Sequence, residues 1–241
     1  LELLASAGVD VSRVHVASGV PTGHAFVQVA ADGENAIVIV PGANRDMPEA
    51  LLDRAVGLLE ADDWLLLQNE TDWVPEAIVR AGATAARVAL NLAPADTAAR
   101  AWALEQVDLF VLNETEAEIL TGETDPLAQF AVLARRAPRA LVALTLGAAG
   151  AMLAAGPEAA GPASPLRVPA FAVDVVDATG AGDAFTGCLL ASLVQGRAPA
   201  AALARANAAG ALACTRPGAA PAMPDAGAIT ALLARRPAPR D

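Results

Sequence analysis

The stretch of sequence with the most reactive chemistry runs from Asp177 to Asp183 and reads Asp-Ala-Thr-Gly-Ala-Gly-Asp. Its small residues Gly180, Ala181 and Gly182 stand at the start of an apolar segment with the composition of a helix. Backbone N–H groups at such a start can converge on an anion, which the helix dipole also attracts. Asp183, in the first turn, can accept a proton from an attacking hydroxyl. An anion hole beside a carboxylate base indicates phosphoryl transfer, although a short G-x-G-D string also suits a tight turn with a helix cap.

The charged residues of the chain exclude several kinds of binding site and partner. All 16 basic side chains among the 241 residues are arginines, and lysine is absent. Without an ammonium group the chain can hold neither the lysine-containing phosphate-binding loop nor a Schiff base. The 27 acidic residues give a net charge of -11, which argues against nucleic acid or an anionic membrane as the main partner. We therefore expect small-molecule ligands.

The cysteine content and the apolar runs predict the compartment. Cys188 and Cys214 are the only cysteines, too few for a disulfide framework or a structural zinc site. The longest uncharged run, residues 140–157, is interrupted by glycines and predicts two short strands joined by a turn, not a membrane span. We expect a reduced, cytoplasmic protein with no membrane partner.

From residue 64 onward, apolar runs alternate with amphipathic segments, which is typical of a parallel sheet covered by helices on both faces. The expected strands are 64–67, 87–90, 109–112 and 141–145. The expected helices are 74–81, 97–106, 115–120 and 127–135, followed by a mostly helical region over 182–234. Earlier, residues 23–30 and 36–40 flank a turn sequence at 31–35 and predict an antiparallel hairpin. The sequence thus predicts one α/β domain over residues 1–241, with a hairpin within about residues 16–44 that projects from a mainly parallel sheet.

Several motifs, taken together, resemble those of the ribokinase-like carbohydrate kinase family. The string from Asp177 to Asp183 is similar to the family's D-T-x-G-A-G-D signature, with Thr179 one place later than in the common form. Asn113-Glu114-Thr115-Glu116 is similar to its N-x-x-E element, and residues 145–150 to its nucleotide-binding turn. The resemblance extends to the segments Pro21–Gly23, Gly33–Asn35, Pro41–Asn44, Leu67–Glu70 and Ala89–Ala95.

This resemblance implies an ATP-dependent kinase that phosphorylates D-ribose at O5 to give D-ribose 5-phosphate and ADP. It implies that Asp183 is the base, that Asp183 and Glu70 contact the sugar, and that Gly180, Ala181 and Gly182 form the anion hole. The nucleotide-binding residues that it implies are Asn113, Thr145, Leu146, Gly147, Ala148, Ala149, Gly150, Gly182 and Asn207.

The same resemblance implies two cations and a partner. It places Asn113 and Glu116 near Mg²⁺, through water, and this ion normally keeps several waters and few protein ligands. It implies an activating K⁺, held largely by backbone carbonyls, at Asp177, Thr179, Ala213, Arg216, Gly218 and Ala222. Ala222 stands where a hydroxyl residue is common. The hairpin would be a lid over the sugar, and its strands would pair two copies into a homodimer.

Each position also has a structural explanation. Asn113 and Glu116 suit an acidic helix start, residues 145–150 a strand-ending turn, Glu70 a solvated sheet edge and Asn207 a polar helix face. The resemblance begins part-way into the family pattern, so we expect a chain that lacks the family's N-terminal region and exposes a sheet edge. Two other functions stay open: a related kinase acting on fructose, 2-keto-3-deoxygluconate or a nucleoside, and a noncatalytic module that binds nucleotide and dimerises.

Overall fold

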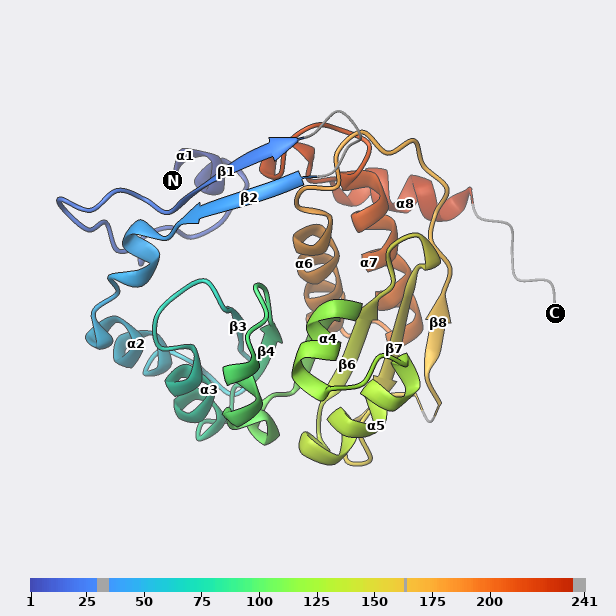
Figure 1. Ribbon diagram of the computed structural model, residues 1–241, viewed down its shortest axis with the longest axis horizontal. Coiled ribbons are helices and arrows are strands. Elements are labelled where there is room, and N and C mark those ends of the chain that lie inside the picture. Colours follow the sequence, from blue (N-terminus) through green and yellow to red (C-terminus); the bar gives the residue numbers. More distant parts are fainter. Residues whose placement is uncertain (30–34, 163, 236–241) are drawn as a thin grey trace.

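A computed structural model describes residues 1–29, 35–162 and 164–235 (Figure 1). Two strands of a small sheet come first, and six strands of a larger one follow. The strands are β1 (His24–Val29), β2 (Asn35–Val40), β3 (Trp64–Gln68), β4 (Arg87–Asn91), β5 (Leu109–Asn113), β6 (Leu141–Thr145), β7 (Ala151–Ala155) and β8 (Leu166–Val168). The helices are α1 (Glu2–Ser6), α2 (Glu49–Val56), α3 (Val74–Gly82), α4 (Glu114–Thr121), α5 (Pro126–Arg136), α6 (Ala181–Val194), α7 (Pro199–Ala213) and α8 (Ala226–Ala234). Short 3-10 helices are η1 (Gly42–Arg45), η2 (Thr97–Ala101), η3 (Leu104–Gln106), η4 (Gly147–Ala149) and η5 (Ala220–Ala222).

The larger sheet has the strand order β3-β4-β5-β6-β7-β8. The first four strands are parallel, whereas β7 and β8 each run antiparallel to the strand before them. Because β3 to β6 are parallel, their carboxyl ends meet at one edge, where Gln68 pairs with Asn91 and Asn113 with Thr145. The predicted α/β class with a mainly parallel sheet is confirmed.

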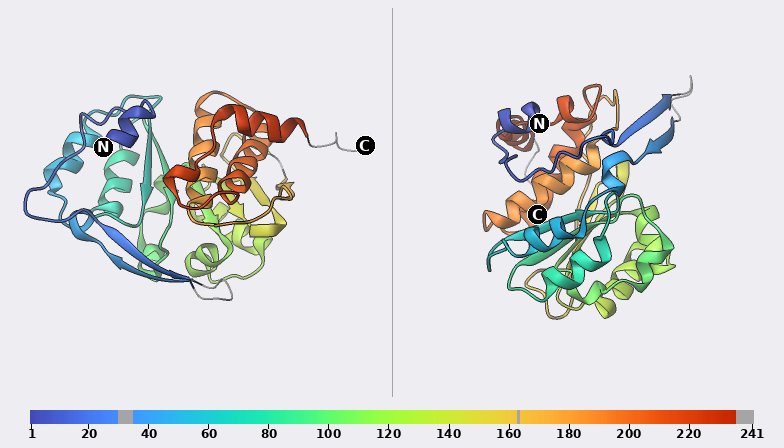
Figure 2. Two further views of the ribbon diagram at one scale, coloured as in Figure 1. Left: turned by 90° about the horizontal axis from the view of Figure 1, so that it is seen from above. Right: turned by 90° about the vertical axis from the view of Figure 1, so that its left-hand side faces the viewer.

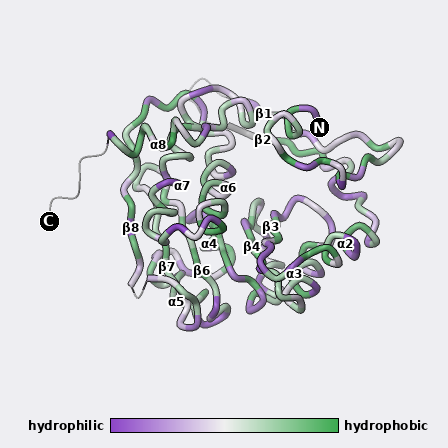
Figure 3. Tube along the Cα trace, turned by 180° about the vertical axis from the view of Figure 1, so that it is seen from behind, coloured by the Kyte–Doolittle hydropathy of each residue, from purple (hydrophilic) through white to green (hydrophobic). Residues whose placement is uncertain are grey.

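Alternating side chains along the strands build the core on both faces of the sheet. Phe110 and Leu112 of β5 pack into a cluster with α3, α4 and α5, and the intervening Leu109 and Val111 pack against α6 and α7. Figures 1 and 2 show the sheet between these two helical layers, and Figure 3 shows the strands mostly in hydrophobic green. Burial of alternate residues on opposite faces is the physical reason that these apolar runs form strands and not helices.

Close helix packing brings α7 to the start of α6. A Cβ added at Gly210 of α7 would lie 3.2 Å from the carbonyl oxygen of Ala181. Ala184 of α6 and Ala208 of α7 belong to a third buried cluster, which α8 completes through Ile229. The small residues in these helices therefore fix the first turn of α6, where the candidate base is located.

The predicted hairpin is confirmed as the antiparallel pair β1 and β2, which Figure 1 shows apart from the larger sheet. Phe26 and Val38 are each 58% exposed, so the described part of the hairpin leaves apolar side chains in solvent. The turn predicted over residues 31–35 falls mainly outside the described residues, and Asn35 already belongs to β2. Within the part of the chain that the structure describes, no helix is both long and apolar enough to cross a bilayer.

The helix predicted over residues 97–106 is wrong. The segment forms η2 and η3, separated at Trp102, which has an extended backbone with ψ of 161°. Ala99 and Leu104 are both fully buried in the same cluster. In a continuous α-helix, residues five apart point about 140° away from each other, so the break lets both side chains enter one core.

The helix α2 and the three-residue strand β8 are among the elements that were not expected. The expected open edge is β3, which pairs only with β4 among the described strands and leaves Leu66 41% exposed.

Candidate active site

The carboxyl end of β3 meets the start of α6 through a chain of amide side chains. Nε2 of Gln68 donates to Oδ1 of Asp183 at 3.0 Å and to Oδ1 of Asn91 at 2.8 Å. Nδ2 of Asn91 in turn donates to the carbonyl oxygen of Val111 at 2.9 Å, in the buried part of β5. Gln68 thus orients the carboxylate of the candidate base, although the two residues are 115 positions apart in the sequence, and Asn91 anchors Gln68 to the backbone of the sheet.

Sequence reasoning missed Gln68 and Asn91 as site residues. The available signal was their position, because both are the last residues of adjacent parallel strands, where polar side chains converge.

Helix α6 begins with open backbone amides beside this carboxylate. Its N-cap, Gly180, is left-handed with φ of +78°, and no side chain caps the helix. Ala181 N–H bonds to the Ala178 carbonyl, whereas the N–H groups of Gly182 and Asp183 have no acceptor among the described residues. A Cβ at Gly182 would meet nothing within 4 Å. Of the residues predicted to form the anion hole, Gly182 has an open amide, whereas the Ala181 N–H is already bonded. The unpaired amides at the positive end of the helix dipole are those of Gly182 and Asp183.

The loop before α6 is held against the segment after α7. Glycine is favoured at position 180 by its left-handed φ of +78°, and an added Cβ would also lie 3.1 Å from Cα of Ala219. The carboxylate of Asp177 accepts from the N–H groups of Thr179 at 2.9 Å and Gly218 at 2.8 Å. Hydrogen bonds from the Thr179 side chain, the Gly218 backbone and the Thr179 backbone hold the pKa of Asp177 below its usual value.

The structure therefore brings together three of the residues predicted to hold K⁺: Asp177, Thr179 and Gly218. Ala213 and Ala222 are buried and Arg216 is exposed, in the same segment as Gly218. An anionic carboxylate among turning backbone carbonyls supplies the hard oxygen donors that a monovalent cation needs.

Glu70 is exposed in the turn that follows β3, two residues after Gln68. This turn is tied to the loop after β4, because Asn69 donates its N–H to the Ala93 carbonyl at 3.0 Å and Nδ2 to the Pro94 carbonyl at 2.8 Å. The predicted sugar contact and the predicted base thus lie at the same end of β3.

Asn113 and Glu116 form a capping box at the start of α4. Oδ1 of Asn113 accepts from the Glu116 N–H, and Oε2 of Glu116 accepts from the Asn113 N–H, both at 2.8 Å. Burial raises the pKa of Glu116, and the hydrogen bond from Asn113 opposes this effect. The structural explanation of this motif is therefore observed.

The capping box limits how these residues could serve Mg²⁺. The cap uses one carboxylate oxygen and leaves Oε1 of Glu116 available. No three His, Cys, Asp or Glu side chains in the described ranges are grouped to hold a metal. The residues fit contact with the water shell of Mg²⁺, not a metal centre ligated by the protein.

The predicted nucleotide turn is a tight reversal between β6 and β7. The Leu146 N–H bonds to the Gly150 carbonyl at 2.8 Å, and Gly147 to Ala149 are exposed. Gly150 has φ of +96°, and a Cβ there would lie 2.0 Å from the Val168 carbonyl oxygen.

Asn207 contacts the same end of β8 from α7. Its Nδ2 donates to the Pro169 carbonyl at 2.8 Å and to that of Val168 at 3.5 Å. The structure thus brings Asn207 and Gly150 to the same end of β8, while no described contact links either residue to Asp183. The nucleotide turn lies next to the start of α4 because Thr145, the last residue of β6, pairs with Asn113 of β5.

Known proteins are similar to this chain over most of its length. The model of the pfkB family carbohydrate kinases matches residues 1–226. A ribokinase of Haemophilus influenzae is 33% identical over 91% of the chain and 72% of its own length, and a ribokinase of Arabidopsis thaliana is 34% identical over 94% and 60%. A deoxyribokinase of Salmonella typhi is 34% identical over 80% and 63%. The chain thus spans roughly two thirds of the length of these relatives.

Solved structures show the same likeness in three dimensions. The Arabidopsis thaliana ribokinase complexed with ribose and ATP matches with a TM-score of 0.73 at 29% identity, over 89% of this chain and 70% of that one. A Vibrio cholerae fructokinase in a fructose, ADP and calcium-bound form matches with a TM-score of 0.77 at 25% identity, over 96% and 80%. The extent of the family match identifies this chain as a member of the pfkB family of carbohydrate kinases.

Proposed function

We propose that the protein phosphorylates D-ribose at O5 with ATP as the co-substrate. The observation that carries this proposal is the hydrogen bond from Gln68 to Asp183, because it sets the base beside the turn that presents Glu70. Sugar and phosphate donor would then meet between the end of β3 and the start of α6. The two relatives named ribokinase, and the relative complexed with ribose and ATP, support ribose as the acceptor.

In the proposed reaction Gln68 occupies Oδ1 of Asp183 and leaves Oδ2 to accept the proton of the sugar hydroxyl. The sugar oxygen attacks the γ-phosphorus in line, and the bond from this phosphorus to the oxygen of the ADP leaving group breaks. The open N–H groups of Gly182 and Asp183 stabilise the charge on the transferred phosphoryl group. Mg²⁺, when bound with ATP near Asn113 and Glu116, would neutralise phosphate charge.

The remaining assignments belong to the same proposal. Residues 145–150 and Asn207 bind the nucleotide, and the loop of Asp177, Thr179 and Gly218 with residues 213, 216 and 222 holds K⁺. The strands β1 and β2 form a lid over the sugar and pair two copies into a homodimer, with Phe26 and Val38 as exposed apolar contacts. Residues 1–241 belong to a single carbohydrate-kinase domain, and the protein acts in the cytoplasm.

A sugar panel tests the acceptor. We expect the largest kcat/KM with ribose and a product that ³¹P NMR identifies as a 5-phosphate. Deoxyribose and fructose are the leading alternatives, because relatives of the chain include a deoxyribokinase and a fructokinase. A larger kcat/KM with either sugar would make that sugar the proposed acceptor instead of ribose. ATP binding and dimerisation without turnover of any sugar would support the noncatalytic module instead.

A further inference from the structure

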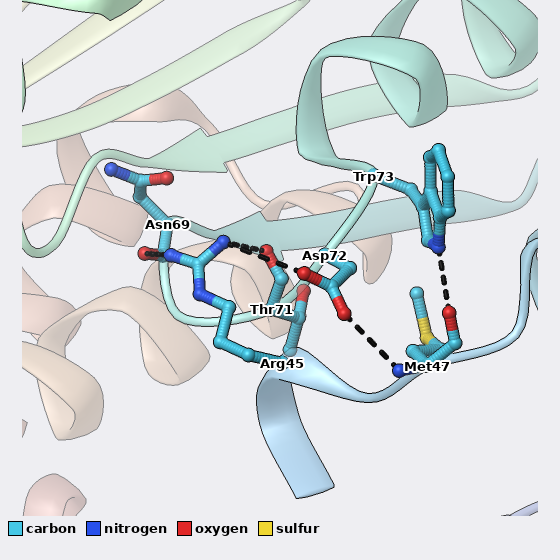
Figure 4. A network of polar contacts seen from close by, with 6 residues as sticks. All are labelled: Arg45, Met47, Asn69, Thr71, Asp72 and Trp73. Atoms are coloured by element: carbon cyan, nitrogen blue, oxygen red, sulfur yellow. Dashed lines mark hydrogen bonds and ion pairs between the residues drawn. The ribbon is translucent and has the colours of Figure 1, made fainter. Parts of the chain in front are cut away.

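A single arginine side chain holds the turn that presents Glu70. In Figure 4, the guanidinium of Arg45 reaches from η1 to the turn after β3. Nη1 donates to the Thr71 carbonyl oxygen at 2.8 Å and Nη2 to that of Asn69 at 3.1 Å. These two carbonyls belong to the residues on either side of Glu70. The backbone of Glu70 is therefore clamped from both flanks.

Further bonds fasten η1 to the same turn. Oδ1 of Asp72 lies 4.0 Å from Nη1 of Arg45, and Oδ2 of Asp72 accepts from the Met47 N–H at 3.1 Å. The Asp72 N–H donates to the Asn44 carbonyl at 3.1 Å. Nε1 of Trp73 donates to the Met47 carbonyl at 2.7 Å, and Trp73 itself has a left-handed backbone with φ of +64°. The two segments are therefore joined by backbone and side-chain contacts from both sides.

The other side of η1 is fixed to the base of the hairpin. The Ala43 N–H donates to the Pro21 carbonyl at 2.9 Å. A Cβ at Gly42 would lie 2.3 Å from the Pro21 carbonyl oxygen, and one at Gly23 would lie 2.6 Å from that of Pro41. The backbone of η1 therefore packs closely against the segments where β1 begins and β2 ends. A continuous series of contacts connects the hairpin base through η1 and Arg45 to the turn of Glu70.

We propose that Arg45 is a positioning residue for sugar binding, which fixes the Glu70 turn and couples it to the base of the β1–β2 hairpin. The inference rests on the sugar-kinase function proposed above. Arg45 does not touch the reacting atoms; it acts through the backbone of residues 69–71. Arginine is required because its planar fork directs two separate nitrogens to two separate carbonyls, whereas the three donors of a lysine ammonium share one nitrogen and cannot span both.

Steady-state kinetics of Arg45→Met and Arg45→Lys test the proposal. We expect both variants to raise KM for the sugar by about 10-fold, since two hydrogen bonds from a charged donor are lost or reduced to one. We expect kcat and KM for ATP to stay within about twofold of wild type, because Gln68, Asp183 and the start of α6 make no contact with Arg45. Arg54→Met is the matched control, since Arg54 is an exposed arginine of α2 with no polar partner in the described ranges.

A double-mutant cycle with Glu70→Gln separates positioning from general stability. If Arg45 acts through Glu70, Arg45→Met adds little to the sugar KM of the Glu70→Gln variant. Hydrogen exchange gives a second readout: the Asp72 and Asn69 amides should exchange faster in Arg45→Met while the core amides of β5 do not change.

The outcomes distinguish this inference from the proposed function. An unchanged sugar KM in Arg45→Met, wild-type behaviour in Arg45→Lys, or an equal loss in sugar KM, ATP KM and kcat would each overturn the role of Arg45 and leave the kinase proposal intact. If the wild-type chain neither turns over nor binds a sugar by calorimetry, the proposed function fails, and the inference fails with it.

Discussion

Replacing Gln68 by methionine removes the hydrogen-bond donor that orients the candidate base and keeps the side-chain length. A hydrogen bond to a charged group contributes about 1.5–3 kcal/mol, and each ~1.4 kcal/mol is a factor of ten in rate. Asp183 is exposed, so water replaces part of the lost bond and the lower end of this range applies. We expect kcat to fall about 10-fold and KM for ATP to stay within about twofold, because Gln68 orients the carboxylate and contacts no predicted nucleotide residue.

A coupled assay of ADP release measures this loss, and denaturant unfolding accompanies it. Asn91 is 8% exposed, and its Oδ1 loses the Gln68 donor, so we expect the free energy of unfolding to fall by about 1–3 kcal/mol. Gln68→Glu should cost more activity than Gln68→Met, since its carboxylate faces two other oxygen acceptors. The control is Gln195→Met, at the end of α6, where the side chain only accepts from Arg197.

The reasoning is refuted if Gln68→Glu retains wild-type kcat. It is also refuted if Gln68→Met lowers kcat no more than Gln195→Met does while the unfolding free energy drops as expected. That result would make the amide chain a purely structural feature of the sheet edge.

Three further predictions concern stability. Burial raises the pKa of Glu116 above its usual value of 4.5 in the folded state. The stability of wild type relative to Glu116→Gln should therefore be greatest below pH ~4.5 and decline as pH rises through the folded pKa. Urea unfolding across this pH range measures the difference. Hydrogen bonds lower the pKa of Asp177 from 3.8 in the folded state. Wild type should therefore have a larger free energy of unfolding than Asp177→Asn above pH ~3.8, and this difference should disappear as pH falls through the folded pKa. A difference that persists in acid would contradict this cause. Gly150→Ala places a Cβ 2.0 Å from the Val168 carbonyl oxygen and should lower the unfolding free energy by more than ~2 kcal/mol. Gly187→Ala adds a Cβ inside α6 that meets nothing within 4 Å, and should raise the unfolding free energy by ~0.5–1 kcal/mol. Equal effects of the two substitutions in thermal unfolding would refute the packing argument.

Local patterns were sufficient for most of the fold. The continuous apolar run of β5 and the helical periodicity of α5 are properties of neighbouring residues, so they can be recognised without tertiary information. The structure of the segment 97–106 could not be predicted from local patterns. The break at Trp102 depends on the packing of both Ala99 and Leu104 into one core. The strand β8 has three residues, too few to show a period.

The candidate site divides in the same way. Asp183 and Gly180 stand in a contiguous motif, and the structure gives them the local geometry that the motif predicts. The contacts of Gln68 and Arg45 could not be predicted from local sequence. Gln68 lies 115 residues from Asp183, and Arg45 lies 24 to 26 residues from the carbonyls that it binds. Asn113 and Glu116 show the opposite case: the sequence left a structural and a functional explanation open, and the capping box realises the structural one and leaves one carboxylate oxygen for water.

The most direct test of the central claim compares wild type with Asp183→Asn in ribose-dependent ADP release, with Mg²⁺ and K⁺ present and ATP binding measured by calorimetry on both proteins. The amide of asparagine can still accept the hydrogen bond from Gln68, but it cannot take the proton of the sugar hydroxyl. We predict unchanged ATP affinity and a loss of at least about 10²-fold in kcat. Full turnover by Asp183→Asn would contradict the assignment of Asp183 as the base and, with it, the mechanism derived from its contact with Gln68.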